Sequence, residues 1–331
     1  MKPSQINLIA DRVISSRKGV SRDEALSLMH TDHIDALCDA ADRIRKTFHG
    51  NHFDSCSIVN ARSGMCGEDC KWCAQTRHHD TRCVTYNFLE EDKTMQAARM
   101  NERMGIRRFS LVTSGRRVSD RDLDTFCHIY EKLRKETDLC LCASMGLLDQ
   151  RQLARLKDAG VERYHCNMET SPRMWPSLCT THSQEDKRNT IEAARRLGMA
   201  ICSGGIIGMG ETTEDRVDFA LMLRDLEVES VPMNILNPIK GTPLENTPLI
   251  PEEDIVRCAA VWRFILPLQT IRFAGGRGRL SKDNMRRIFT GGIDGAIMGD
   301  MLTTIGNTIE EDKSLLRSLD LSLEPPHPPE G

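Results

Sequence analysis

RRFSLVT (residues 107–113), SDRDLDTFCHIYEKLRKE (119–136) and LCLCASM (139–145) follow one another with only short turns between them. The first and third segments are short and apolar, which is typical of buried strands. The middle segment carries apolar residues at the spacing of one helix face. A strand, a helix and a second strand in this order favour parallel pairing of the strands, with the helix packed on the sheet.

The same alternation continues along most of the chain. The other predicted strands are SCSIVN (55–60), ERYHCNM (162–168), AICSGGI (200–206), ESVPMNI (229–235), TIRFAG (270–275) and GAIMGD (295–300). Gly105, Gly160 and Gly198 each lie just before a strand, where glycine commonly ends a helix. Eight strands with helices between them predict an α/β fold, a parallel (β/α)8 barrel of the TIM type. A doubly wound open sheet has the same local pattern and is the structural alternative.

The two ends of the chain depart from this pattern. Residues 1–50 predict an N-terminal helical extension, in which Ser21 and Glu24 form the capping box of one helix. The barrel is expected over residues 51–318. Residues 319–331 end in a polar segment rich in proline, which predicts a disordered tail.

The composition argues against several classes of protein. The 331 residues carry a formal net charge of −3 and no basic stripe, so we expect a small-molecule substrate and no nucleic-acid partner. No signal peptide and no membrane-spanning apolar run is visible, which predicts a soluble, cytoplasmic protein with no membrane partner. Thirteen cysteines in a reducing compartment favour metal ligands and buried thiols over disulfides.

The strongest chemical signal is the motif Cys66-Gly-Glu-Asp-Cys70-Lys-Trp-Cys73, directly after the first predicted strand. Three thiolates at this spacing can hold a cubane cluster of four irons and leave one iron open for another ligand. The alternatives are a zinc knuckle, which His78 and His79 could complete, and three incidental cysteines.

CxxxCxxC is the signature of the radical S-adenosylmethionine superfamily, which this chain resembles. The resemblance implies a [4Fe–4S] cluster on Cys66, Cys70 and Cys73, whose open iron binds S-adenosylmethionine. Cleavage of that cofactor gives a 5′-deoxyadenosyl radical. Trp72 matches an aromatic residue that commonly lies against the adenine.

Longer stretches resemble the biotin synthase family over roughly residues 20–320. They are SGMCGEDCKWCAQ (63–75), RYHCNMETSP (163–172), CSGGIIGMGET (202–212), VPMNILNPIKGTPL (231–244), IRFAGGR (271–277) and GDMLTTIGN (299–307). The family inserts sulfur between two unactivated carbons of dethiobiotin, the last step of biotin formation, and such carbons need a radical because no protein base can deprotonate them. The resemblance also implies reduced flavodoxin or ferredoxin as electron donor, and a homodimer.

The resemblance assigns two sets of contacts. The cofactor set comprises Trp72, Thr113, Asn167, Glu169, Lys187, Ile206 and Asn237, and the substrate set comprises Asn167, Asn234, Thr303 and Thr304. Strand alternation independently places His165, Asn167 and Glu169 on one face. Glu169, His165 and Lys187 stand where aspartate, asparagine and arginine are familiar, and a lysine supplies charge without a bidentate fork.

The family also carries an auxiliary cluster, commonly [2Fe–2S], which is the proposed sulfur donor. Cys142, Cys202 and Arg272 match three of its four ligands, whereas Ser110 stands at the fourth position in place of cysteine. A serine oxygen is a harder ligand for iron than a thiolate. Three arrangements are open: Ser110 acts as an oxygen ligand, Cys140 replaces it, or the cluster differs in nuclearity with Cys166 nearby.

The remaining cysteines are predicted to be core or surface thiols: Cys38, Cys56, Cys83, Cys127, Cys179 and Cys258. Two further hypotheses compete with the biotin synthase reading. One is a related radical enzyme of the hydrogenase-maturation or methylornithine-synthase type. The other is a structural or electron-carrying protein that binds zinc or an iron–sulfur cluster, for which a complete barrel is far more scaffold than required.

Overall fold

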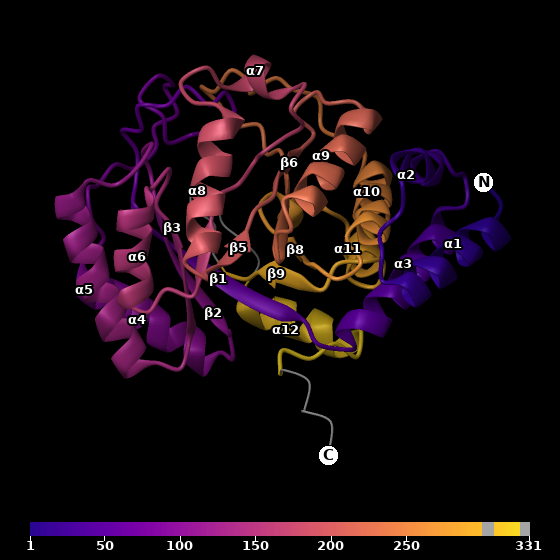
Figure 1. The fold of residues 1–331 in the computed structure, drawn as a ribbon, viewed down its shortest axis with the longest axis horizontal. Coiled ribbons are helices and arrows are strands. Elements are labelled where there is room, and N and C mark those ends of the chain that lie inside the picture. Colours follow the sequence, from indigo (N-terminus) through magenta and orange to yellow (C-terminus); the bar gives the residue numbers. More distant parts are fainter. Residues whose placement is uncertain (300–307, 325–331) are drawn as a thin grey trace.

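Nine parallel segments form a closed barrel in the computed structural model, which describes residues 1–299 and 308–324 (Figure 1). They are β1 (Asp54–Arg62), β2 (Arg108–Thr113), β3 (Cys140–Ser144), β4 (Arg163–His165), β5 (Ala200–Cys202), β6 (Gly205–Ile207), β7 (Ser230–Ile235), β8 (Thr270–Phe273) and β9 (Gly295–Ile297). β5 and β6 occupy one strand position, because β5 pairs with β4 and both segments pair with β7. The ring of eight strand positions therefore closes, which confirms the barrel and rules out the open sheet.

The break between β5 and β6 has a steric cause. The backbone of other segments comes so close here that a Cβ on Gly204 would lie 2.0 Å from the Pro232 carbonyl oxygen. A Cβ on Gly205 would lie 2.1 Å from the carbonyl oxygen of Glu169. Only glycine permits this approach, so the strand expected over 200–206 is interrupted where the chain turns across its neighbours.

The helices of the described residues surround the barrel (Figure 1). They are α1 (Pro3–Ser16), α2 (Arg22–Met29), α3 (Ile34–His49), α4 (Glu91–Arg103), α5 (Asp120–Glu136), α6 (Gln150–Asp158), α7 (Trp175–Leu178), α8 (Gln184–Arg196), α9 (Thr213–Asp225), α10 (Glu252–Ile265), α11 (Lys282–Phe289) and α12 (Ile309–Ser318). Several begin with a reciprocal cap, including the predicted pair of Ser21 and Glu24 at α2. None of the helices within residues 1–299 and 308–324 is long and apolar enough to cross a membrane.

The two ends of the chain pack on the barrel. α1 lies on α3, and α3 lies against α10 on one side of the molecule (Figure 1). At the other end, Leu321 is buried, and the backbone N–H of Phe53 donates a hydrogen bond to the Ser322 carbonyl oxygen. Within the segment 319–331, the described residues up to 324 therefore lie beside the first strand. Residues 325–331 lie outside the described residues.

The barrel interior is polar at its lower end. Asp54 on β1 accepts hydrogen bonds from Arg272 at 2.9 Å and from Arg108 at 3.1 Å, and Arg163 lies 3.8 Å away. These arginines come from β8, β2 and β4, so side chains from different strands meet across the barrel axis. The strand alternation that points Asp54 inward also points Cys56 and Ile58 inward. Ile58 lines a cavity at the upper end, where the carboxyl ends of the strands form the mouth.

Candidate functional site

Two adjoining cavities of about 210 and 350 Å³ lie at the barrel mouth. Trp72, Cys73, Asn167 and Glu169 line both of them, so the two spaces share a wall. A larger depression of about 540 Å³ lies beside α12 and the turn before β2, but no cysteine or histidine lines it. The chemistry predicted from the sequence therefore gathers at the mouth, where TIM-type barrels place their sites.

Cys66, Cys70 and Cys73 all line the first cavity. Their loop is folded back on itself, because the Cys66 N–H donates to the Gln75 carbonyl and the Arg77 N–H donates to the Cys66 carbonyl. The Cys73 sulfur accepts a hydrogen bond from the Gln75 N–H at 3.4 Å. Burial raises the pKa of the Cys73 thiol to about 11, so it is the binding of a metal that would deprotonate it.

These three thiols do not form a tight set around a single ion. Within residues 1–299 and 308–324, one set of three cysteine, histidine or acidic residues places its ligand atoms within 4.8 Å of one another, and it contains only Cys70 of the motif. Cysteines that bind separate irons are farther apart than cysteines that share one ion. Three separated thiols facing one cavity therefore fit a cluster of several irons better than a mononuclear site.

The zinc knuckle with His78 and His79 is not formed. His78 Nε2 lies 3.1 Å from the Gly67 carbonyl oxygen, and His79 Nδ1 lies 3.0 Å from the Cys73 carbonyl oxygen. Both rings hydrogen-bond the backbone of the cysteine loop. They act as braces of this loop, and their nitrogens are engaged away from the thiols.

The polar residues after β4 reach the cavity as predicted, although not by strand alternation. β4 ends at His165, and Glu169 has a left-handed backbone with φ of 70°, but His165, Asn167 and Glu169 all line the first cavity. Asn167 Oδ1 accepts from the Gly204 N–H at 3.2 Å. Burial raises the pKa of Glu169, and the nearby Lys187 ammonium opposes that rise.

The remaining residues of the predicted cofactor set also line the two cavities. Thr113 and Lys187 face the first cavity, and Ile206 and Asn237 face the second. The Thr113 hydroxyl is buried and makes no hydrogen bond to any residue that the structure describes. Lys187 Nζ lies 5.2 Å from the centre of the Trp175 ring, a cation–π contact that fixes the ammonium near the cavity.

Asn234, predicted to contact substrate, lines the second cavity and also holds its walls together. Its Nδ2 donates to the Gly205 carbonyl at 3.0 Å, and its Oδ1 accepts from the Gly275 N–H at 2.9 Å. One side chain thus joins β6, β7 and the turn after β8. Thr303 and Thr304, predicted to hold the substrate carboxylate, lie outside the described residues.

Glu211 is an intramolecular brace. Its carboxylate accepts from the backbone N–H groups of Gly208 and Met209, each at 2.7 Å, and it pairs with Arg216. The glycine-rich turn after β6 is therefore closed by its own acidic residue, and this carboxylate has no free oxygen directed at a ligand.

Below the mouth lies a second group of functional candidates, buried inside the barrel. Ser110, Cys142, Cys202 and Arg272 are at most 1% exposed. Burial would raise the pKa of Cys202, but His165 and Arg272 lower it to about 6. Several buried polar atoms here make no hydrogen bond within residues 1–299 and 308–324: Ser110 Oγ, Arg163 Nε and Nη1, His165 Nε2 and Arg272 Nε. Such atoms are rare without a reason, so this interior fits an additional anionic, hydrogen-bond-accepting group.

The structure adds Cys56 to this group, a residue to which the sequence assigned no role. Cys56 is 1% exposed, and its charge when ionised acts on Cys142 and on Arg272. Cys202 and Arg272 in turn act on Cys56. Cys56, Cys142 and Cys202 are therefore mutual neighbours around Arg272. The signal was present in β1, because Cys56 is two residues from the inward-facing Asp54.

The two alternatives considered for Ser110 lie elsewhere. Cys140 is only half-buried, whereas Cys142 on the same strand is fully buried, and both thiols have Arg108 as a charged neighbour. The Cys166 sulfur lies 3.9 Å from the Lys187 carbonyl oxygen, and its charged neighbours are Lys187 and Glu169. The thiols that act on Arg272 are Cys56, Cys202 and Cys142.

Two family models match the chain. Residues 62–223 match the radical SAM superfamily, and residues 232–322 match the biotin and thiamin synthesis associated domain. Curated relatives named biotin synthase are 49% identical over 300 residues in Clostridium botulinum, 50% over 298 in Heliobacterium modesticaldum and 47% over 304 in Parabacteroides distasonis. Each alignment covers at least 90% of this chain and at least 91% of the relative.

Solved structures with the same fold are more distant in sequence. A methylornithine synthase superposes with a TM-score of 0.80 at 18% identity, covering 94% of this chain and 95% of that one. The FeFe-hydrogenase maturase HydG from Carboxydothermus hydrogenoformans gives a TM-score of 0.80 at 16% identity, covering 96% of this chain and 79% of its own. At such identities the likeness concerns the fold alone.

Proposed function

The chain belongs to the biotin synthase family, and on that premise we propose how its own residues hold the reactants. It is a radical S-adenosylmethionine enzyme that inserts sulfur into dethiobiotin to form biotin. The family uses a [4Fe–4S] cluster, S-adenosylmethionine and an auxiliary iron–sulfur cluster. The assignment of residues is carried by the placement of two sets of thiols along the barrel axis. Three thiols on the mouth loop lie above three buried thiols around Arg272.

At the mouth, Cys66, Cys70 and Cys73 would hold the [4Fe–4S] cluster, with one iron left for S-adenosylmethionine. When bound, these cofactors supply a carbon-centred radical that removes hydrogen from unactivated carbon, and the auxiliary cluster supplies sulfur. The loop contributes three ligands from eight residues and keeps them apart by its own backbone hydrogen bonds. It also forms part of the wall that the two cavities at the mouth share.

The residues that line the two cavities would bind S-adenosylmethionine. The family resemblance assigns Trp72 and Ile206 to the adenine, and Asn167 and Glu169 to the ribose. It assigns Thr113 and Lys187 to the methionine end of the cofactor, and Asn237 to the outer wall of its site. The Glu169 carboxylate can accept hydrogen bonds from hydroxyl groups, and the Gly204 N–H fixes the orientation of the Asn167 amide. The buried Thr113 hydroxyl without a protein partner supports a polar ligand at that wall.

Dethiobiotin would occupy the second cavity, between the cofactor and the buried thiols. Asn234 and Asn167 are the proposed partners of the ureido ring, and Thr303 and Thr304 are the proposed partners of the carboxylate. Both polar groups of the Asn234 amide already bind backbone atoms. Asn234 would therefore also contribute to recognition by holding β6, β7 and the turn after β8 at the spacing that the substrate requires.

For the auxiliary cluster we assign Cys56, Cys142 and Cys202 as thiolate ligands, with Arg272 beside them. In this assignment Cys56 on β1 replaces the cysteine that is absent at Ser110 on β2. A thiolate matches iron better than a serine oxygen does. Five buried nitrogen and oxygen atoms without hydrogen bonds surround these thiols and support an anionic group among them.

Three further features of the reaction are proposed from the family resemblance. Reduced flavodoxin or ferredoxin would deliver the electrons, and two copies of the chain would form a homodimer. The enzyme would work in the cytoplasm, where its thirteen cysteines stay reduced.

The test of the function is anaerobic incubation of the reconstituted enzyme with dethiobiotin, S-adenosylmethionine and a reductant. We expect both 5′-deoxyadenosine and biotin to form. Formation of 5′-deoxyadenosine without biotin would contradict the proposed function and favour a related radical enzyme. Failure of the metal-free chain to take up iron and sulfide on anaerobic loading would contradict the cluster assignment altogether.

A further inference from the structure

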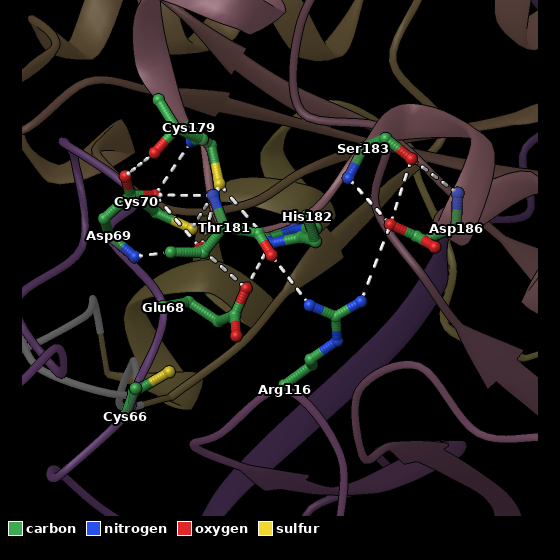
Figure 2. Close-up of polar contacts among 12 residues, drawn as sticks. Cys66, Glu68, Asp69, Cys70, Arg116, Cys179, Thr181, His182, Ser183 and Asp186 are labelled. Carbon is green, nitrogen blue, oxygen red and sulfur yellow. Dashed lines mark hydrogen bonds and ion pairs between the residues drawn. The ribbon is translucent and has the colours of Figure 1, made fainter.

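A separate cluster of metal-ligating side chains lies beside the mouth loop and contains Cys70, Cys179 and His182 (Figure 2). The two sulfur atoms are 3.7 Å apart, and the Cys179 sulfur lies 3.4 Å from His182 Nδ1. One ligand atom from each residue falls within 4.8 Å of the other two. Cys66 stands apart from this cluster in Figure 2, so the cluster differs from the CxxxCxxC set.

The backbone holds this arrangement by contacts that involve none of the three ligand atoms. Lys71 N–H donates to the Leu178 carbonyl at 3.0 Å, and the Asp69 carboxylate accepts from the N–H groups of Thr180 at 2.9 Å and Thr181 at 3.2 Å. The loop after α7 is therefore fastened to the cysteine loop at several points. The three ligand residues face one another because these hydrogen bonds hold the two loops together.

The surroundings suit an ion. The Cys179 residue is 3% exposed, and the side chains of His182 and Glu68 are 7% and 11% exposed. Glu68 Oε2 is hydrogen-bonded to His182 Nδ1. An ion bound at Nδ1 would displace the proton shared by this pair. The Glu68 carboxylate would then stay beside the imidazole, where its negative charge favours a bound cation.

We propose that the cluster-free protein binds one divalent cation of the zinc type through Cys70 Sγ, Cys179 Sγ and His182 Nδ1, with the fourth tetrahedral position left to water. Thiolates and an imidazole are donors that zinc prefers. The binding releases protons from the thiols and changes no oxidation state. This site goes beyond the sulfur-insertion reaction and does not depend on it.

The site and the proposed [4Fe–4S] cluster exclude each other, because both require the Cys70 sulfur. A protein molecule that holds zinc therefore cannot complete its mouth cluster until the ion leaves. Cys179 and His182 therefore allow zinc to occupy the Cys70 thiol, and so to protect it, while the cluster is absent.

The site is tested by titrating the full-length, cluster-free chain anaerobically with Zn²⁺ against a coloured chelator, and with Co²⁺ to count thiolate ligands by their absorption. We expect one ion per chain with two thiolates. Cys179→Ser and His182→Gln should each weaken zinc binding by more than about 100-fold, since each removes a direct ligand. Cys73→Ser is the matched control in the same loop and should change the affinity by less than about threefold.

Two results would overturn the proposal. The first is stoichiometric zinc that survives Cys179→Ser and His182→Gln but is lost in Cys73→Ser, which would place the ion in the CxxxCxxC set. The second is no stoichiometric binding by the wild-type chain. Circular dichroism of each variant controls for misfolding, and His182→Gln provides a second variant if Cys179→Ser fails to fold.

The exclusion is tested by adding one equivalent of Zn²⁺ before iron and sulfide loading. Iron uptake should fall by about four atoms per chain in the wild type, the content of one cubane, and by none in Cys179→Ser. Equal suppression in both proteins would contradict the shared use of Cys70. Neither measurement uses dethiobiotin, so a failure here is distinct from a failure to form biotin.

Discussion

The mouth loop and the barrel interior both gather three thiols, but they do so in opposite ways. Cys66, Cys70 and Cys73 come from one loop of eight residues whose backbone hydrogen bonds fix it locally. Cys56, Cys142 and Cys202 come from β1, β3 and β5, and only the closure of the barrel makes them neighbours. A local set can be identified by spacing, whereas a set assembled from strands depends on register and on which side chains face inward.

The largest expected effect is at the mouth. Cys70→Ala should abolish both 5′-deoxyadenosine and biotin, because the loop loses one of the three thiolates proposed to hold the [4Fe–4S] cluster. Product analysis by liquid chromatography measures this, together with iron content, which should fall by about four atoms per chain. The control is Cys127→Ala on the outer helix α5, which should keep both products. Turnover by Cys70→Ala would contradict the ligand assignment.

In the interior, Cys56→Ser should separate the two chemistries. We expect 5′-deoxyadenosine to persist, while biotin and the iron of the auxiliary cluster fall by about tenfold or more, because a serine oxygen is a poorer ligand for iron. Mössbauer spectra of the reconstituted protein report the cluster directly. Ser110→Ala is the matched control and should leave the spectrum unchanged. The double variant with Cys56→Ser and Ser110→Cys should recover iron if position 110 can supply the missing thiolate.

Loss of auxiliary iron in Ser110→Ala but not in Cys56→Ser would reverse the assignment. The serine would then be the fourth ligand, and the neighbourhood of Cys56 would be structural.

A substitution of Asp54 at the lower end of the barrel interior should change the free energy of unfolding more than it changes product formation. Asp54→Asn leaves Arg272, Arg108 and Arg163 without their shared carboxylate, and removing one partner of such a buried pair costs about 3–5 kcal/mol. Urea unfolding monitored by circular dichroism measures this. The conservative variant Asp54→Glu, which keeps the charge, should lose less.

The same residue predicts a pH dependence. Burial would raise the pKa of Asp54, but Arg272, Arg108 and Arg163 hold it well below its usual range. Its contribution is therefore complete above the unfolded carboxyl pKa of about 4 and is lost as the pH falls toward the lower folded value. The free energy of unfolding should decline more steeply below about pH 5 in the wild type than in Asp54→Asn. Parallel curves for the two proteins would contradict this account.

The smallest effects compare one glycine from each region. Gly205→Ala should lower the free energy of unfolding by about 1–3 kcal/mol and weaken S-adenosylmethionine binding, because the new Cβ would lie 2.1 Å from the Glu169 carbonyl oxygen. Gly67→Ala in the cysteine loop should have almost no effect on stability, since its Cβ would meet only the end of Arg77 at 3.9 Å. Calorimetric titration and urea unfolding measure both. Equal effects would mean that the close approach between β6 and the turn after β4 is unimportant.

The sequence was sufficient for the barrel, because each strand and helix carries its own periodicity, and for the mouth thiols, because their ligand spacing is local. It was insufficient where the outcome depended on packing between distant segments. The break of the strand at Gly204 follows from the approach of Pro232 on β7, beyond the intervening helix α9, and no local pattern records that approach. Cys56 and Cys179 looked like ordinary buried thiols for the same reason.

His165 and Glu169 show a prediction that succeeded by another route. Both side chains reach the mouth, yet β4 ends at His165, and a left-handed turn at Glu169 carries the chain onward. The segment after residue 318 gives a further example of packing that no local pattern records. Leu321 is apolar and finds a buried position beside the first strand, although a proline-rich segment follows it.

The Asp54 carboxylate and the three guanidinium groups around it occupy the lower end of the barrel interior. In the proposed assignment, the auxiliary cluster of Cys56, Cys142 and Cys202 lies above this group, and the two cavities at the mouth mark the other end of the barrel. Iron and sulfide for repair of that cluster would then enter at the same end as dethiobiotin. An enzyme saturated with substrate should therefore be slow to rebuild the cluster.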